Sequence, residues 1–302
     1  MIFQLQNKMR RRFAVSVLFL SSAGWGLTWL PIKGLNGMGL DVIHLVFIAF
    51  ASAGLMLSPF LFVQRRSWSG KIKFLLLIAV LGGFANLSFQ TAIYHGNVVR
   101  VMILFYLLPV WSVLGGWYFL KEKPDWIRIG AVMISLAGAF LILRVDAGTF
   151  EDLSWIDLLA VGAGLSFALN NLVFRATETE PVASKVSAMF LGCALLMGGY
   201  VLFNPVPTST AGNNVILYAI LYGVAWLTLI TFGTQWGVTQ LEAGRAALII
   251  VMELVAAVVS VAVLTEISLS NREIIGGLMV LTAAIIEGWR EPPSAVESKA
   301  IS

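Results

Sequence analysis

The sequence predicts an all-α integral membrane protein of ten transmembrane helices, arranged as two inverted five-helix repeats. Three observations predict this: the composition, a succession of uncharged apolar stretches, and the recurrence of one pattern in both halves. Of the 302 residues, 59% are hydrophobic and 12% are charged, and the mean hydropathy is +0.88. Soluble globular domains carry about 25% charged residues. The composition therefore places this chain in a membrane.

Apolar stretches of the length that a bilayer requires follow one another along the chain. A hydrocarbon core of about 30 Å is crossed by about 20 residues of helix. Helices satisfy their own backbone hydrogen bonds there, which open strands do not. Short connections separate the stretches, so no soluble domain is expected between them. The predicted helices are residues 13–32, 42–63, 73–95, 99–120, 126–143, 156–174, 185–203, 215–239, 246–265 and 273–289.

The first apolar stretch imitates a secretory signal. Basic residues at positions 8–12 precede it, and the small residues Ser21, Ser22 and Ala23 lie inside it. A cleaved signal has a short apolar region that ends near such small residues. Here the apolar character continues to Pro31. We therefore interpret this stretch as the first transmembrane helix, uncleaved.

Lys and Arg residues gather on one side of the predicted membrane. With the N-terminus in the cytoplasm, sixteen lie on the inner side and four on the outer side, namely Lys33, Arg100, Arg144 and Arg272. Cytoplasmic loops carry this excess of positive charge. Both termini, with the polar tail at residues 291–302, are therefore predicted to be cytoplasmic, in a multi-pass protein of the inner (plasma) membrane. The pI near 9.3 reflects this orientation and predicts no nucleic-acid partner.

A pattern in the fourth predicted helix recurs in the ninth. Each apolar stretch opens near an arginine and closes on a glutamate. Pro109 precedes Glu122 by thirteen residues, and Glu253 precedes Glu266 by the same interval. Such spacing is the signature of an internal repeat.

The first and sixth predicted helices carry a second match. The segment Trp25-Gly26-Leu27-Thr28 is followed by Lys33, and 142 positions later Phe167-Ala168-Leu169-Asn170 is followed by Arg175. The predicted repeats are residues 1–146 and 150–290. Because each holds five helices, the second crosses the membrane in the opposite sense to the first. Inverted repeats of this kind are typical of secondary transporters.

These residues resemble the EamA-type members of the drug/metabolite transporter superfamily, and within it most closely the YddG-type amino acid exporters. The resemblance rests on Trp25, Gly26, Thr28 and Lys33 in the first helix, and on Pro109 with Glu122 in the fourth. The second copy departs from the family pattern, since Glu253 stands where a proline is usual. The resemblance implies export of amino acids or related small metabolites through a central cavity. It also implies that the fifth and tenth helices are peripheral.

Polar residues inside the third and eighth helices are candidates for the wall of that cavity. Asn86, Gln90 and Tyr94 recur at every fourth position and so share one helical face. Gln235 and Trp236 lie in the eighth helix with Thr228 and Thr231 nearby. Polar groups in hydrocarbon tend to face a wet cavity. The alternative for each is a hydrogen bond that holds two helices together.

Further candidates lie in the first, fourth and sixth helices. Trp25 and Thr28 occupy positions that correspond to Phe167 and Asn170, with Asn171 beside the latter. Their side chains either contact the substrate or pack between helices. Tyr106 lies three residues before Pro109, which has no N–H to donate and so frees the carbonyl of Phe105. The resulting kink is either a gating hinge or a feature of shape.

Glu253 is the only carboxylate well inside a predicted helix. A buried carboxylate suits proton coupling or pairing with a substrate ammonium, and the alternative is a structural hydrogen bond. Glu122 and Glu266 are expected to hold loops. Arg100 and Arg245 lie at helix N-termini, where positive charge opposes the helix dipole. We expect each of these arginines to have a carboxylate or lipid phosphate partner.

The remaining chemistry predicts neither an enzyme nor a cofactor. His44, His95 and the single Cys193 form no cluster at catalytic or metal-ligand spacing, so no catalytic residue, metal or cofactor is predicted. The expected partners are a small-molecule substrate and the lipid bilayer, and the sequence assigns no oligomeric state. Multidrug or organic cation efflux is an alternative function. A nucleotide-sugar or phosphorylated-metabolite exchanger would need a cationic cavity. An intramembrane enzyme and a channel fit the pattern less well.

Overall fold

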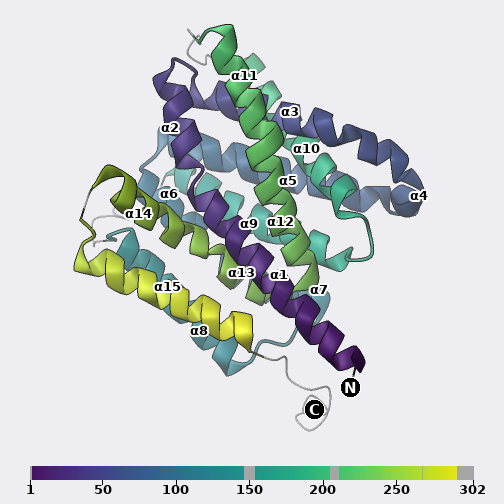
Figure 1. The fold of residues 1–302 in the computed structure, drawn as a ribbon, viewed down its shortest axis with the longest axis vertical. Coiled ribbons are helices and arrows are strands. Elements are labelled where there is room, and N and C mark those ends of the chain that lie inside the picture. Colours follow the sequence, from purple (N-terminus) through teal and green to yellow (C-terminus); the bar gives the residue numbers. More distant parts are fainter. Residues whose placement is uncertain (1, 146–153, 205–210, 267, 291–302) are drawn as a thin grey trace.

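The structure is a bundle of crossing helices (Figure 1). The computed structural model describes residues 2–145, 154–204, 211–266 and 268–290, with side chains from residue 9 onward. Within these ranges, eight helical stretches are long and apolar enough to cross a membrane. The predicted all-α membrane class is confirmed. The count of ten crossings stays a prediction, because α8 and α15 (bounds below) are not among those eight stretches.

The helices of the predicted first repeat follow the predicted spans closely. The fifth predicted span is the shorter apolar helix α8. A short connection, α4 and the 3₁₀ turn η1, joins α3 to α5. The elements are α1 (Ile2–Gly26), α2 (Trp29–Gly37), α3 (Val42–Val63), α4 (Arg65–Trp68), η1 (Ser69–Lys71), α5 (Ile72–His95), α6 (Val98–Phe105), α7 (Leu108–Leu120) and α8 (Trp126–Ile142).

The predicted second repeat has the same succession of long helices. Its eighth predicted span contains a π-helical turn, η3, between α11 and α12. The elements are α9 (Trp155–Ala176), α10 (Val182–Phe203), α11 (Asn213–Leu221), η3 (Tyr222–Leu227), α12 (Thr228–Gln240), α13 (Ala243–Ile250), α14 (Met252–Thr265) and α15 (Asn271–Trp289).

Two predicted spans are each broken near their middle. The fourth breaks between α6 and α7, where Pro109 lacks the N–H that would bond to the carbonyl of Phe105. The ninth breaks at Val251, between α13 and α14, although Glu253 stands where the first repeat has a proline. The break therefore does not depend on proline. Discontinuous helices of this kind occur at the binding sites of secondary transporters.

The helix ends that follow these breaks are alike. Lys121 after α7 and Glu266 after α14 both have left-handed backbones, with φ of 59° and 56°. A left-handed residue is a common way to end a helix. Glu266 thus occupies the same position at its helix end as Lys121.

Glycines allow several of the helices to cross closely. A Cβ on Gly192 of α10 would lie 2.0 Å from the carbonyl oxygen of Ala79 in α5. A Cβ on Gly138 of α8 would lie 2.6 Å from the carbonyl oxygen of Gly276 in α15, and a Cβ on Gly276 would lie 2.5 Å from the carbonyl oxygen of Gly138. Small residues at helix crossings are typical of membrane bundles. The pair α8 and α15 lies along one edge of the bundle (Figure 1).

We use two names for the ends of the bundle. The inner rim is the end at which α1 begins and α15 ends, and these two ends lie near each other (Figure 1). The charge bias of the sequence predicts that the inner rim faces the cytoplasm. The outer rim is the end at which α8 ends and α15 begins.

Candidate functional site

The two helix breaks are joined by a hydrogen bond. Tyr106, directly after α6, donates its hydroxyl to Oε1 of Glu253 at 2.9 Å. Tyr106 is buried, with 3% of its surface exposed. Glu253 is the second residue of α14, so its carboxylate lies where that half-helix starts. The structure therefore brings together two of the predicted site residues from opposite halves of the chain.

The end of α1 packs against the start of α14, beside Glu253. A Cβ on Gly26, the last residue of α1, would lie 2.2 Å from the carbonyl oxygen of Glu253 and 2.8 Å from the backbone N of Ala257. Only glycine allows the two backbones to approach this closely. The sequence presents this glycine beside Trp25, in the segment that carried the family resemblance.

Aromatic rings gather around Phe105, the neighbour of Tyr106. The ring of Phe105 lies 5.6 Å from the ring of Tyr106, 4.7 Å from Phe89 of α5 and 5.9 Å from Phe167 of α9. These distances are those of favourable aromatic contacts. We call Phe89, Phe105, Tyr106, Phe167 and Glu253 the central cluster.

Phe89 and Phe105 were not among the predicted site residues. Phe105 carries a signal that was available in the sequence, because Pro109 frees its carbonyl. That carbonyl faces α9, where a Cβ on Gly164 would lie 2.7 Å from the oxygen. Phe89 has no comparable signal, since phenylalanine is common in this chain, with 19 residues.

A second polar group links α9 and α12. Gln235 donates its Nε2 to Oδ1 of Asn171 at 3.2 Å, and both residues are buried. Oε1 of Gln235 and the hydroxyls of Thr231 and Thr234 are buried without a hydrogen-bond partner among the described residues. Buried polar atoms normally have partners. This pair therefore offers acceptor and donor capacity for a polar ligand or water.

Two other predicted residues hold helices together. Asn86 of α5 donates its Nδ2 to the carbonyl of Gly82 at 3.0 Å and to Sγ of Cys193 at 3.4 Å. Asn170 of α9, fully buried, donates to Sδ of Met189 at 3.6 Å. Both partners in the neighbouring helix belong to α10. These contacts fit the packing alternative, and substrate contact by Asn86 and Asn170 stays a prediction.

The remaining predicted residues lie outside the central cluster. Tyr94 is 48% exposed and packs against His95. Trp236 packs edge-on against Phe13 of α1, with 5.6 Å between ring centroids. Thr28 donates its hydroxyl to the carbonyl of Trp25 at 2.7 Å, in the break between α1 and α2. For these residues, and for the partly exposed Gln90, substrate contact also stays a prediction.

Charged residues gather at the inner rim, where α8, α13 and α15 meet. Arg245 and Glu287 have no exposed surface, and Nε of Arg245 lies 3.6 Å from Oε2 of Glu287. Arg128 lies 3.5 Å from the same oxygen and also contacts Glu242. Arg290 pairs with Asp125 at 2.6 Å and lies 3.7 Å from Oε1 of Glu287. We call these residues the inner ionic cluster: Asp125, Arg128, Glu242, Arg245, Glu287 and Arg290.

Glu122 holds the start of α13 from the other half of the chain. Its Oε2 accepts the N–H of Ala243 at 2.8 Å, and its Oε1 lies 3.5 Å from Nε of Arg175. Burial raises the pKa of Glu122, although the bonds from Ala243 and Arg175 act against the rise. Glu122 therefore fixes a loop, as its place at a helix end predicts.

The two arginines at helix N-termini have carboxylate partners. Nε of Arg100 lies 2.9 Å from Oδ1 of Asp157, which belongs to the capping box of α9. Arg245 faces Glu287 in the inner ionic cluster. A carboxylate offsets the unfavourable interaction of each arginine with its helix dipole. Neither arginine therefore depends on a substrate for its counter-charge.

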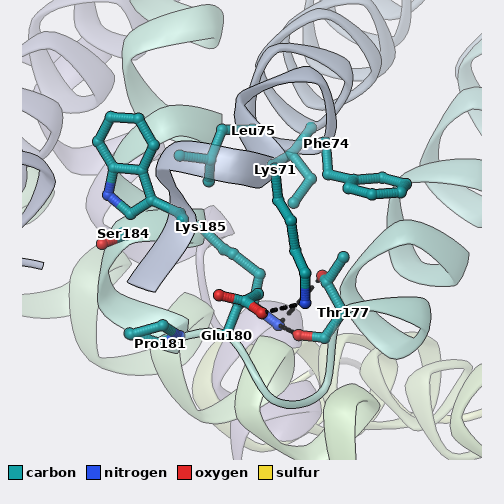
Figure 2. Close-up of a pocket in the computed structure, with 10 residues that line it drawn as sticks. Lys71, Phe74, Leu75, Thr177, Glu180, Pro181, Ser184 and Lys185 are labelled. Carbon is teal, nitrogen blue, oxygen red and sulfur yellow. Dashed lines mark hydrogen bonds and ion pairs between the residues drawn. The ribbon is translucent and has the colours of Figure 1, made fainter. Parts of the chain in front are cut away.

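A shallow hollow at the inner rim contains two lysines (Figure 2). Lys71 pairs with Glu180, and Lys185 donates to the carbonyls of Phe174 at 3.1 Å and Thr177 at 2.7 Å. Lys185 thus satisfies the last carbonyls of α9, where positive charge is favourable. Figure 2 shows both lysine side chains directed at these internal partners. The hollow is therefore not a free cationic site for a phosphorylated substrate.

Comparison with known proteins gives a consistent class. Residues 12–144 match the EamA-like transporter family. The uncharacterized inner membrane transporter YicL of Salmonella typhimurium is 25% identical over 260 residues, which cover 82% of this chain and 83% of YicL. A probable terminal-alkyne amino-acid exporter of Streptantibioticus cattleyicolor is 24% identical over 205 residues, 66% of this chain and 65% of the exporter.

Two further matches widen the comparison. A riboflavin transporter of Vibrio cholerae is 22% identical over 211 residues, which cover 67% of this chain and 66% of that protein. One crystal structure superposes with a TM-score of 0.73 over 91% of this chain and 96% of that chain, at 15% identity. That likeness establishes a shared fold.

Proposed function

We propose that this chain, which is similar to the EamA-like transporter family over residues 12–144 and to the inner membrane transporter YicL, is a membrane transporter of that family that exports neutral or aromatic amino acids, or related small metabolites. Export proceeds by alternating access through the centre of the bundle. The observation that carries the proposal is the central cluster, in which one carboxylate and several aromatic rings meet at two helix breaks. The similarity to a Streptantibioticus cattleyicolor protein described as a probable terminal-alkyne amino-acid exporter supports the choice of substrate class.

The central cluster contains a carboxylate that can pair with the ammonium of an amino acid and aromatic rings that can cover its apolar side chain. The carboxylate of Glu253 pairs with the substrate ammonium, and the hydroxyl of Tyr106 moves from Glu253 to the substrate as it binds. The rings of Phe89, Phe105 and Phe167 cover an apolar or aromatic side chain and contribute cation–π attraction to the ammonium. The hydrogen bond between Tyr106 and Glu253 and the ring contacts of Phe105 with Phe89 and Phe167 support these roles.

The substrate carboxylate needs donors. The half-helices α7 and α14 begin in the middle of their spans, at Leu108 and Met252. Helix N-termini carry partial positive charge, and transporters place them at anionic groups of the substrate. The buried amides of Asn171 and Gln235 supply further donors between α9 and α12. We assign the substrate carboxylate to these groups.

Efflux of an organic cation is the second candidate function. Glu253 and the aromatic rings would serve a cation as well as they serve an ammonium. The amide pair distinguishes the two candidates, because a cation without a carboxylate has no use for Asn171 and Gln235. Exchange of nucleotide-sugars or phosphorylated metabolites is less well supported, because Lys71 and Lys185 are occupied by internal partners.

The test is transport by purified protein in liposomes. A panel of labelled amino acids is offered with and without a pH gradient, to the parent protein, Glu253→Gln and the control Glu178→Gln. Glu178 is an exposed carboxylate at the inner rim. We expect saturable transport of neutral and aromatic amino acids by the parent and the control, with loss of the pH response in Glu253→Gln. Transport of a cationic drug and of no amino acid would overturn the proposed substrate class.

A further inference from the structure

The helices α8 and α15 are tied by ion pairs at both rims, and the two ties differ in their surroundings. At the outer rim, Arg144 lies 3.2 Å from Glu273, and the side chain of Arg144 is 60% exposed. At the inner rim, Arg290 pairs with Asp125 beside the fully buried Glu287. The outer ion pair is therefore exposed to solvent, whereas the inner ion pair adjoins a cluster in which Arg245 and Glu287 are fully buried.

The inner ionic cluster joins the two predicted repeats. Asp125 and Arg128 belong to the first, and Glu242, Arg245, Glu287 and Arg290 belong to the second. The contacts of Arg128 with Glu242 and Glu287, and of Arg290 with Asp125, all cross between the repeats. Separating the repeats at this rim would break each of these contacts.

The half-helix α13 contributes Arg245 to this cluster and is buried along its whole length. All eight of its residues, Ala243 to Ile250, are buried. Its first N–H is held by Glu122 of the first repeat. Access to the central cluster is therefore closed at the inner end of the broken helix.

The geometry of the cluster is that of a contact able to separate. Arg245 lies 3.6 Å from Glu287 and 3.9 Å from Glu242, and its guanidinium nitrogens make no hydrogen bond with the residues that the structure describes. Burial of charged groups is costly, and attraction recovers the cost only with good geometry and full hydrogen bonding. Hydration of these groups after separation would return part of that cost. Separation of Arg245 from Glu287 therefore breaks no hydrogen bond of the Arg245 guanidinium among the described residues.

We propose that the inner ionic cluster is the inner gate of this transporter, closed in the present structure with Arg245 and Glu287 buried, and hydrated when the central cluster opens at the inner rim. The contact between Glu122 and the N–H of Ala243 belongs to the same gate and releases α13 with it. This inference rests on the proposed alternating access. It adds a role for charged residues that touch no substrate.

The test measures access to α13 and needs no substrate. Cys193 is replaced by alanine, and Ala247, which is buried in α13, is replaced by cysteine. A membrane-impermeant maleimide is added to inside-out membrane vesicles. In this background, Asp125→Arg breaks the partly exposed tie to Arg290, and Asp125→Arg with Arg290→Asp restores it with the charges exchanged. The control is Glu273→Gln, which breaks the tie between the same two helices at the outer rim.

We expect Asp125→Arg to raise the labelling rate by at least about fivefold, because the open population increases. The exchanged pair should return the rate toward that of the parent, and the control should leave it unchanged. The proposal is overturned if Asp125→Arg inserts normally and is labelled at the parent rate, or if Glu273→Gln raises labelling equally. If labelling responds as expected while no amino acid is carried, the gate stands and the proposed substrate class fails.

Discussion

Tyr106 and Glu253 are 147 residues apart in the sequence, and their side chains meet at 2.9 Å between two broken helices. The contact is the most direct link between the centres of the two predicted repeats. The contact pairs the uncharged hydroxyl of Tyr106 with the ionisable carboxyl group of Glu253. A change in either residue should therefore alter transport more than it alters folding.

Substitution of Tyr106 by phenylalanine tests this link. The variant keeps the ring that packs against Phe105 and removes the hydroxyl. A hydrogen bond to a charged group contributes about 1.5 to 3 kcal/mol, so we expect the initial rate of amino acid transport in liposomes to fall about tenfold or more. Thermal stability in detergent should fall as well, because the variant also removes the hydroxyl's bond to Glu253. Unchanged transport in Tyr106→Phe would remove this residue from the site.

The close approach of α1 to α14 predicts a strict requirement at Gly26. A Cβ at this position would lie 2.2 Å from the carbonyl oxygen of Glu253, which is backbone and cannot rotate away. Gly26→Ala should therefore move α1 or α14 and abolish transport. Gly34→Ala is the matched control, because nothing lies within 4 Å of a Cβ at Gly34. Equal transport by the two variants would contradict the packing described for α1.

The amide pair separates the two candidate substrates. Gln235→Leu removes the amide donor Nε2, which bonds to Asn171 in the present structure. We expect the variant to lose affinity for amino acids and to retain any transport of organic cations, because a cation has no carboxylate for the amides. Competition by unlabelled substrates in the liposome assay measures both. Equal loss for both classes would assign the pair to structure alone.

The two lysines of the hollow in Figure 2 should differ in their effect on stability. Lys185→Met leaves the carbonyls of Phe174 and Thr177 without this donor, and a buried group that loses its partner costs about 1 to 3 kcal/mol. Lys71→Met breaks a pair in which the lysine side chain is 46% exposed, and such pairs contribute at most about 1 kcal/mol. Thermal unfolding in detergent compares the variants. A larger loss in Lys71→Met would contradict this ranking.

Glu122 predicts a dependence of stability on pH. Burial raises the pKa of its carboxyl in the folded protein, so the folded state holds a proton that the unfolded state has already released. The contribution of Glu122 to the free energy of unfolding therefore falls as pH rises from the ordinary value, about 4.3, through the raised value. Glu122→Gln keeps an acceptor for Ala243 and should lose this part of the pH dependence. Thermal unfolding between about pH 4 and pH 7 measures the difference.

Hydropathy and residue spacing predicted most of the fold. Predicted helix 42–63 coincides with α3, and 99–120 differs by one residue at its start from the stretch that α6 and α7 form. Apolar length alone decides such elements, because a lipid bilayer leaves the backbone little alternative to a helix. The sequence also marked Pro109 as a point of change, since proline removes a helical hydrogen bond wherever it stands. The second break, at Val251, had no comparable local signal.

The site was predicted less completely, because a helical face does not reveal which neighbour it meets. Asn86 and Gln90 share a face by spacing, and only the packing of α5 on α10 shows that Asn86 bonds to Cys193. Phe89 enters the central cluster because Phe105 lies beside it after the break in the fourth helix. Contacts of this kind join residues far apart in the chain, and local pattern carries no record of them.

The sequence by itself determined the membrane class, the helix positions and the presence of one carboxylate inside the ninth predicted helix. Those properties follow from hydrophobic length and from the cost of charge in lipid, which each segment carries alone. The tertiary structure decided that Glu253 meets Tyr106, that Glu122 caps α13, and that Arg245 is buried against Glu287. Each of those contacts joins separate helices, and so depends on how the helices pack and on which glycines let them approach.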